Sequence, residues 1–134
     1  MIKLTTLFLL LTVATFTNGQ SNSDKLDTTS IERVFETAPE PIGGMENFFR
    51  FLKSNLVYPK DARKQRKKGE VLVEFIVSSD GTVKPESARI AQGVFESIDK
   101  EALRVIKLSP KWRPGTRNGR PIEMRMVMPI NFNF

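Results

Sequence analysis

Few side chains in this sequence could carry out chemistry. It contains no cysteine and no histidine, so it lacks thiol and imidazole nucleophiles, the usual general base near neutral pH and the commonest metal ligand. Asp61, Asp80 and Glu86 are the most obvious carboxylates, but no spacing pairs two of them as a general acid and base. Neither a glycine-rich phosphate loop nor a metal-ligand cluster occurs in the sequence. The sequence therefore predicts a protein that is not an enzyme and uses no cofactor, no metal and no small-molecule substrate.

Positive charge is the other chemical feature. The 134 residues include 21 Lys+Arg and 15 Asp+Glu, a net charge of +6. Much of the excess lies in PKDARKQRKKGE, residues 59–70. Nucleic acid is one interpretation of such a run, but the run lacks interleaved aromatic residues and the chain has the start of an exported protein. A solvated helix end, or weak attraction to anionic surfaces, explains the run better, and we expect no nucleic-acid partner.

The N-terminus is typical of a secretory signal peptide. In MIKLTTLFLLLTVATFTNGQ an early lysine precedes an apolar run from Leu4 to about Phe16, and small and polar residues follow. The run is shorter than the roughly 20 apolar residues that a membrane-spanning helix needs. We expect residues 1–19 to be the signal peptide, residues 20–38 a flexible leader and residues 39–134 a single domain. If the first segment were not cleaved, it would associate the protein with a membrane.

The first helix is predicted between Met45 and Leu56, where apolar residues recur at the spacing of one helix face. Tyr58-Pro59 ends this helix, because proline disfavours helical geometry in the residue before it. Pro59 also suits the first turn of a following helix, so a short helical stretch can restart there and stop at Gly69.

A hairpin follows. Residues 71–77 alternate in the manner of a strand, Asp80-Gly81 supplies the turn, and Val83 begins the return strand. Pro85 cannot donate a ladder hydrogen bond, so we expect the return strand to lie at a sheet edge or to contain a bulge. The strand before the turn is then expected to be central.

The last two elements are a helix and a long strand. Ser97 is the predicted N-cap of a helix that ends near Leu108. Beyond a turn-rich stretch, apolar residues occupy every second position from Ile122 to Phe134, the period of a strand with one buried face. A strand in this terminal position can have an unpaired edge.

The predicted order is helix, strand, strand, helix, strand. Two amphipathic helices can cover one face of a sheet, and each apolar face needs a partner layer. We therefore predict an α+β fold, a three-stranded antiparallel sheet with two helices packed on one face.

Several ordered motifs resemble the C-terminal domain of the TonB energy-transducer family. They are YPKDARKQRKKGEVLVEFIVSSDGTV, SIDKEALRVIK, KWRPGTRNGRP and MPINF. The resemblance covers about residues 39–134. It implies a periplasmic domain that grips a short peptide, the TonB box, of an outer-membrane receptor, and that takes part in energy-dependent transport. The peptide would add as an extra strand beside the last long strand.

The resemblance also implies which residues meet the partner. The last strand contributes Ile122, Glu123, Met124, Arg125, Met126, Val127, Met128 and Ile130. The segment around Tyr58-Pro59, where the first motif begins, contributes Asn55, Tyr58 and Pro59 as secondary candidates. An open edge binds an extended peptide through backbone hydrogen bonds. We therefore expect proline at Met126 to abolish capture more completely than alanine there.

Other interpretations remain open. Tyr58 and Pro59 can serve only to break the helix and fill a corner of the core. The fold can also act as an envelope contact or a homodimerisation domain without a transport role. A complete TonB protein has a longer membrane anchor and a long proline-rich spacer, whereas only Pro39 and Pro41 precede the first predicted helix here. The resemblance therefore supports peptide binding more directly than force transmission.

Overall fold

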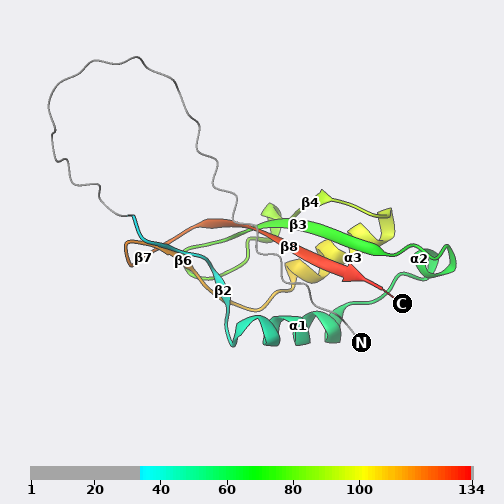
Figure 1. Ribbon diagram of the computed structural model, residues 1–134, viewed down its shortest axis with the longest axis horizontal. Helices are drawn as coiled ribbons and strands as arrows, with labels where there is room; N and C mark the ends of the chain where they lie inside the picture. The colour runs from blue at the N-terminus through cyan, green and yellow to red at the C-terminus, as the bar shows by residue number, and fades with distance from the viewer. Residues whose placement is uncertain (1–33, 134) are drawn as a thin grey trace, which may run out of the picture. The chain divides into compact units, whose positions relative to one another are not determined.

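A three-stranded antiparallel sheet organises the domain in the computed structural model, which describes residues 34–133. The expected signal peptide and most of the expected leader lie outside the described residues. In the sheet, β3 (Gly69–Val77) lies between β4 (Arg89–Gln92) and β8 (Met124–Phe132) (Figure 1). β3 and β8 pair along their whole length, from Gly69 opposite Phe132 to Val77 opposite Met124. The predicted three-stranded antiparallel sheet is confirmed, with β3 central.

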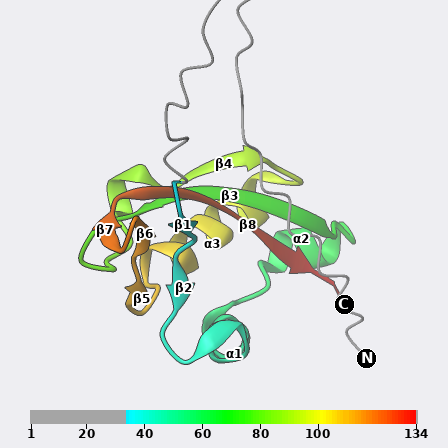
Figure 2. The same cartoon turned by 60° about the vertical axis from the view of Figure 1, so that its left-hand side comes forward.

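Two helices of the predicted amphipathic kind lie on one side of this sheet, α1 (Gly44–Asn55) and α3 (Glu96–Lys107) (Figure 2). Their apolar stripes meet alternate residues of β3 and β8 in one core. The largest fully buried side chains are Trp112, Phe48, Phe75, Phe132, Ile98 and Ile106. Burying one such apolar side chain contributes about 1.5–3 kcal/mol to the stability of the fold. The α+β class is therefore confirmed.

The structure adds elements that periodicity did not predict. The short helix α2 (Lys60–Lys64) follows Pro59, which lies at its N-cap position, as the sequence allowed. There are also two small sheets. One consists of β1 (Glu36–Thr37), β6 (Gly115–Arg117) and β7 (Arg120–Ile122), and the other pairs β2 (Glu40–Pro41) with β5 (Trp112–Arg113). Strands of two or three residues are too short to show alternation. β1 falls within the segment expected to be a leader.

The predicted strand from Ile122 onward is divided in two. β7 pairs with β6, and β8 pairs with β3. The division falls at Glu123, whose carboxylate binds the ammonium group of Lys84. The expectation of one continuous strand is therefore wrong, because its first residue, Ile122, belongs to β7 in the β6–β7 hairpin.

The return strand of the first hairpin is also interrupted. Val83 makes a single bridge to Val77, the 3-10 helix η1 (Pro85–Ser87) follows, and only then does β4 pair with β3. Pro85 begins η1, a position where its missing N–H matters least. β4 lies at the edge of the sheet, as the proline predicted.

The predicted N-cap of α3 is wrong. The residue before the helix is Phe95, and Ser97 lies inside the first turn. The Ser97 hydroxyl is buried and has no hydrogen-bond partner among the described residues. Instead, a carboxylate oxygen of Asp99 accepts the N–H of Val94 at 2.9 Å, and so caps the chain entering the helix.

Candidate functional site

The candidate site is the outer edge of β8, the last strand of the sheet. Figure 1 shows β8 in red on one side of β3, with β4 on the other side. In an antiparallel strand both backbone groups of a residue point to the same side, and successive residues point to opposite sides. The side that each residue of β8 faces can therefore be read from its partner in β3.

Ile76 in β3 decides this direction. Its carbonyl accepts the N–H of Lys84 at 2.9 Å, and its N–H donates to the hydroxyl of Ser87 at 2.9 Å. Both of its backbone groups therefore face away from β8. Arg125, which lies opposite Ile76, must likewise turn its own backbone groups away from β3.

Pro129 supports the same assignment independently. It lies opposite Leu72, four pairs along an uninterrupted register from the Ile76 pair, and an even separation places both residues on the same side of the strand. A proline has no N–H to give to a ladder and is tolerated where that N–H would face solvent. Its missing donor thus lies on the outer side, in agreement with Arg125.

We call the outward backbone groups of Arg125, Val127, Pro129 and Asn131 the open edge. It offers the N–H of three of these residues and the carbonyl of all four. Within residues 34–133 these groups make no backbone hydrogen bond to another segment. Unpaired groups in such a row are a template for an added strand.

The side chains on the outer face of the sheet form a charge cluster. A carboxylate oxygen of Glu74 lies 2.5 Å from Nε of Arg89, and the other oxygen lies 2.9 Å from Nη1 of Arg125. The hydrogen bond from Arg89 holds the pKa of the Glu74 carboxyl below its usual value, and Arg125 adds to the effect. The cluster links β4, β3 and β8 and orients Arg125 beside the open edge. It borders a shallow hollow of about 270 Å³, which Ile76, Glu86 and Ser87 also line.

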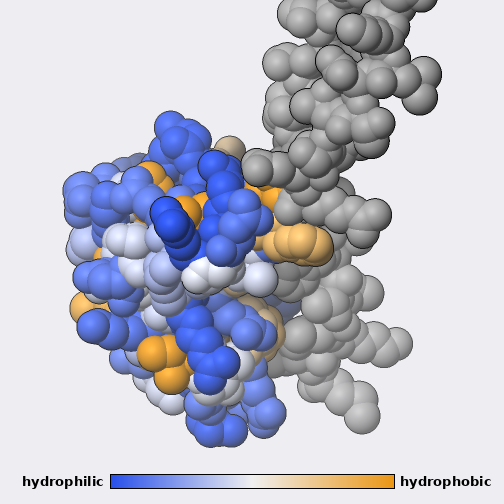
Figure 3. Space-filling view, turned by 90° about the vertical axis from the view of Figure 1, so that its left-hand side faces the viewer, coloured by the Kyte–Doolittle hydropathy of each residue, from blue (hydrophilic) through white to orange (hydrophobic). Residues whose placement is uncertain are grey.

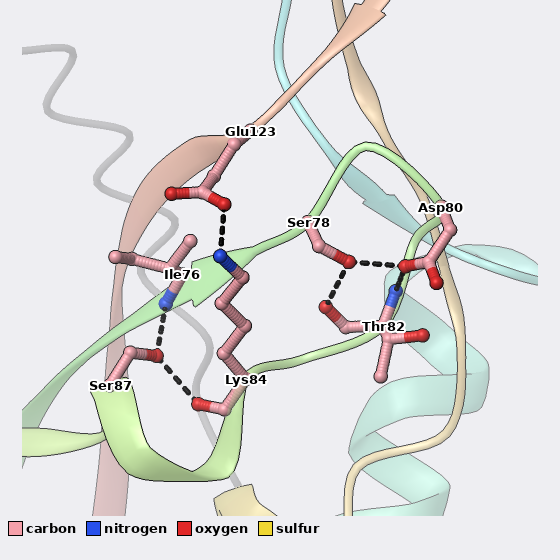
Figure 4. A network of polar contacts seen from close by, with 7 residues as sticks. All are labelled: Ile76, Ser78, Asp80, Thr82, Lys84, Ser87 and Glu123. Atoms are coloured by element: carbon pink, nitrogen blue, oxygen red, sulfur yellow. Dashed lines mark hydrogen bonds and ion pairs between the residues drawn. The ribbon is translucent and has the colours of Figure 1, made fainter.

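A polar network holds the beginning of β8 (Figure 4). Lys84 reaches across the hairpin to Glu123, and this hydrogen bond raises the pKa of the lysine. In the adjoining turn, the Ser78 hydroxyl and the Thr82 N–H donate to Asp80 and lower the pKa of that carboxyl to about 2. The start of β8 is therefore attached to a hairpin that is itself closed by charged hydrogen bonds.

Comparison with known proteins identifies the domain. The family described as Gram-negative bacterial TonB protein C-terminal matches residues 54–134. The chain belongs to this TonB C-terminal family. No curated protein matches the chain.

Solved structures agree with the TonB fold. A solution structure of the Helicobacter pylori TonB C-terminal domain is 23% identical, with a TM-score of 0.51, and the match covers 67% of this chain and 79% of that one. A second structure of that domain is 24% identical, with a TM-score of 0.50 and coverage of 66% and 91%. At this identity the likeness concerns the fold.

Family membership makes this a TonB-like energy-transduction module. Domains of the family are non-catalytic and interact with outer-membrane receptors of the Gram-negative envelope. Among residues 34–133 no three acidic side chains are grouped so that they could hold a metal ion. None of the helices described is long and apolar enough to cross a membrane.

In this TonB-like domain the predicted partner residues between 122 and 130 fall into three groups: those of the open edge, those that face β3, and the two that precede β8. Arg125 and Val127 belong to the open edge, and Val127 is 51% exposed. The others in β8 direct their backbone groups to β3 and their side chains inward: Met124, Met126, Met128 and Ile130. The methionine row therefore faces the core, as its alternation predicted. Ile122 pairs with Gly115 of β6, and Glu123 binds Lys84.

The secondary candidates are divided as well. The ring of Tyr58 packs against Phe132 at the end of β8, with centroids 5.8 Å apart, and Pro59 follows it directly. Asn55 instead makes its contacts with the helices. Its side-chain amide donates a hydrogen bond to the carbonyl of Phe51, and its own carbonyl accepts one from Arg104 of α3 at 2.8 Å.

Pro129 and Asn131 are part of the open edge but were not among the predicted residues. The signal for them was present in the sequence, since a proline within a strongly alternating strand implies an outward-facing backbone position. Applying this rule requires the strand to be placed at a sheet edge first, and the pairing with β3 supplies that placement.

Proposed function

We propose that this domain captures an extended peptide, the TonB box of an outer-membrane receptor, by adding it as a strand to the open edge of β8. The protein would act in the periplasm, where the expected signal peptide directs it. The observation that carries the proposal is the unpaired row of backbone groups at Arg125, Val127 and Asn131, on a terminal strand of nine residues. A TonB-type interaction with receptors is the family's role, and this edge is suited to it.

Exposed side chains at the open edge, and a hydrophilic surface at the end of the domain where β8 begins, favour backbone recognition over an apolar pocket. The face shown in Figure 3, at the end formed by β6 and β7, is mainly hydrophilic, with hydrophobic residues in small separate groups. The buried residues of β8 are already used by the core. Affinity in strand addition comes largely from main-chain hydrogen bonds, and side chains at alternate positions set specificity.

The decisive variant is Val127→Pro. It removes an outward N–H and places a ring carbon where the partner's carbonyl would lie, while leaving the β3 ladder intact. Pro129 shows that β8 accepts proline at this kind of position. Met126, by contrast, directs its N–H to β3, where it lies opposite Phe75, so proline at Met126 would disrupt the fold rather than test the edge.

Binding can be measured by fluorescence anisotropy with labelled synthetic peptides that cover the periplasm-facing segments of the organism's outer-membrane receptors. Val127→Pro should weaken the binding of a captured peptide by about 10-fold or more, the effect of one lost hydrogen bond. The matched control Val127→Ala keeps the N–H and should stay within about 3-fold of the native chain. Equal affinities for the alanine and proline variants would refute strand addition at β8.

A further inference from the structure

The open edge of β8 is interrupted at Pro129. Arg125 and Val127 each offer an N–H and a carbonyl, but the next outward residue has only a carbonyl, and the next donor is that of Asn131. The pyrrolidine ring also occupies the space through which a donor would reach the partner strand. The edge therefore consists of an intact segment at Arg125 and Val127, and a remainder beyond the proline.

We infer that Pro129 determines which strands the edge accepts: it admits a short extended peptide paired at Arg125 and Val127, and it disfavours a second copy of β8. This inference rests on the proposed function, because it concerns the same edge. Pro129 is thus a specificity-determining residue that acts through the absence of a backbone N–H.

A short peptide avoids most of the effect of the proline. The backbone groups of Arg125 and Val127 can make four hydrogen bonds with a strand of about five residues, in either orientation. A longer peptide gains less per residue beyond this segment, because it meets the proline ring and lacks the one hydrogen bond that Pro129 cannot donate. The side chains at the intact segment are accessible, with Arg125 63% exposed and Val127 51% exposed.

A second copy of β8 meets the proline twice. In a two-fold symmetric antiparallel pair that overlaps along the whole of residues 124–132, Val127 of each copy lies opposite Pro129 of the other. Residues that face each other in this way would normally exchange two hydrogen bonds, so each such pair loses one of its two. A heterologous peptide without proline loses only one bond in total.

Registers that avoid the proline are less extensive. Sliding the copies until Arg125 lies opposite Val127 of the other copy leaves an overlap of only residues 124–128. The net charge of +6 on each chain also opposes self-association. Natural proteins protect exposed sheet edges against self-pairing with proline in this manner.

Sedimentation velocity on the purified chain tests the inference without any receptor peptide. Pro129→Thr restores the N–H with a polar β-branched side chain, so added hydrophobicity cannot explain a result. We expect Pro129→Thr to self-associate about 30-fold more tightly than the native chain, since two hydrogen bonds are regained per dimer. Adding Val127→Pro to the same chain should abolish this gain, because it blocks the edge again.

Two outcomes would overturn the inference. One is that Pro129→Thr, and the smaller Pro129→Ala, associate no more strongly than the native chain while circular dichroism shows them folded. The other is that their association persists when Val127→Pro is added. Either result leaves peptide capture by the native chain open, because the anisotropy experiment above measures capture separately.

Discussion

The ring of Tyr58 stands edge-on against the ring of Phe132, with centroids 5.8 Å apart and an interplanar angle of 76°. The Tyr58 hydroxyl donates to the carbonyl of Lys67, and the guanidinium of Arg63 lies 5.5 Å from the ring centroid. Tyr58 therefore joins the segment after α1 to the end of β8. This arrangement gives it a structural role, whether or not it also meets a partner.

Truncating Tyr58 should consequently lower stability. We expect Tyr58→Ala to reduce the free energy of unfolding by about 2 kcal/mol, since a partly buried aromatic pair is lost. Tyr58→Phe keeps the ring contact and should lose about 1 kcal/mol with the hydroxyl's hydrogen bond. Urea unfolding measures both. A direct binding role would appear instead as weaker peptide affinity in Tyr58→Phe with unchanged stability.

Amide hydrogen exchange should alternate along β8. The N–H groups of Met126 and Met128 face β3 and should exchange about 100-fold more slowly, or slower still, than those of Arg125 and Val127, which face outward. Two-dimensional NMR on the free chain measures this pattern. A bound receptor peptide should then protect Arg125 and Val127 selectively. Strong protection of these two amides in the free monomer would mean that the edge is already occupied.

Glu74 should make stability depend on acidity. Its carboxyl has a lowered pKa in the folded chain, chiefly through the hydrogen bond from Arg89. Stability from this group is therefore present above its unfolded pKa, near 4.5, and is lost as the pH falls through the lower folded value. Glu74→Gln should unfold about 1 kcal/mol more easily at neutral pH and lose less stability on acidification.

Thermal unfolding at pH 7 and at pH 3 checks this prediction. Glu46→Gln is the matched control, because Glu46 forms only an exposed helical pair with Arg50 at 3.5 Å. The control should follow the native chain at both pH values. If Glu74→Gln lost as much stability on acidification as the native chain, the charge cluster would not be the source of the pH dependence.

Ser97 should be replaceable. Because its hydroxyl is buried without a partner among the described residues, Ser97→Ala is expected to leave stability unchanged or to raise it by up to about 1 kcal/mol. Asp99→Ala should instead lower stability by about 1 kcal/mol, as the loss of a capping side chain does. Chemical unfolding of the two variants distinguishes the caps, and a loss in Ser97→Ala would restore Ser97 as the cap.

Periodicity determined most of the fold because the core of this domain is built from long regular elements. The helix stripe at residues 45–56 and the alternation of β3 and β8 each span several turns or pairs, so one buried face follows directly from residue spacing. The N-cap of α3 was mispredicted for the opposite reason. Several polar residues there could close the helix, and only packing decides that Ser97 is turned inward while Asp99 caps the chain.

The sequence by itself determined that β8 has one buried face and contains a proline at an alternate position, because both facts lie within the strand. Only the tertiary structure decided that β8 is terminal in its sheet and that β7 is a separate strand pairing with β6. Backbone hydrogen bonds point sideways, toward or away from a neighbour that comes from a distant part of the chain. The outward direction of the backbone groups of Arg125, Val127 and Asn131 therefore follows only from the pairing of β8 with β3, where Ile76 makes its hydrogen bonds to Lys84 and Ser87 instead.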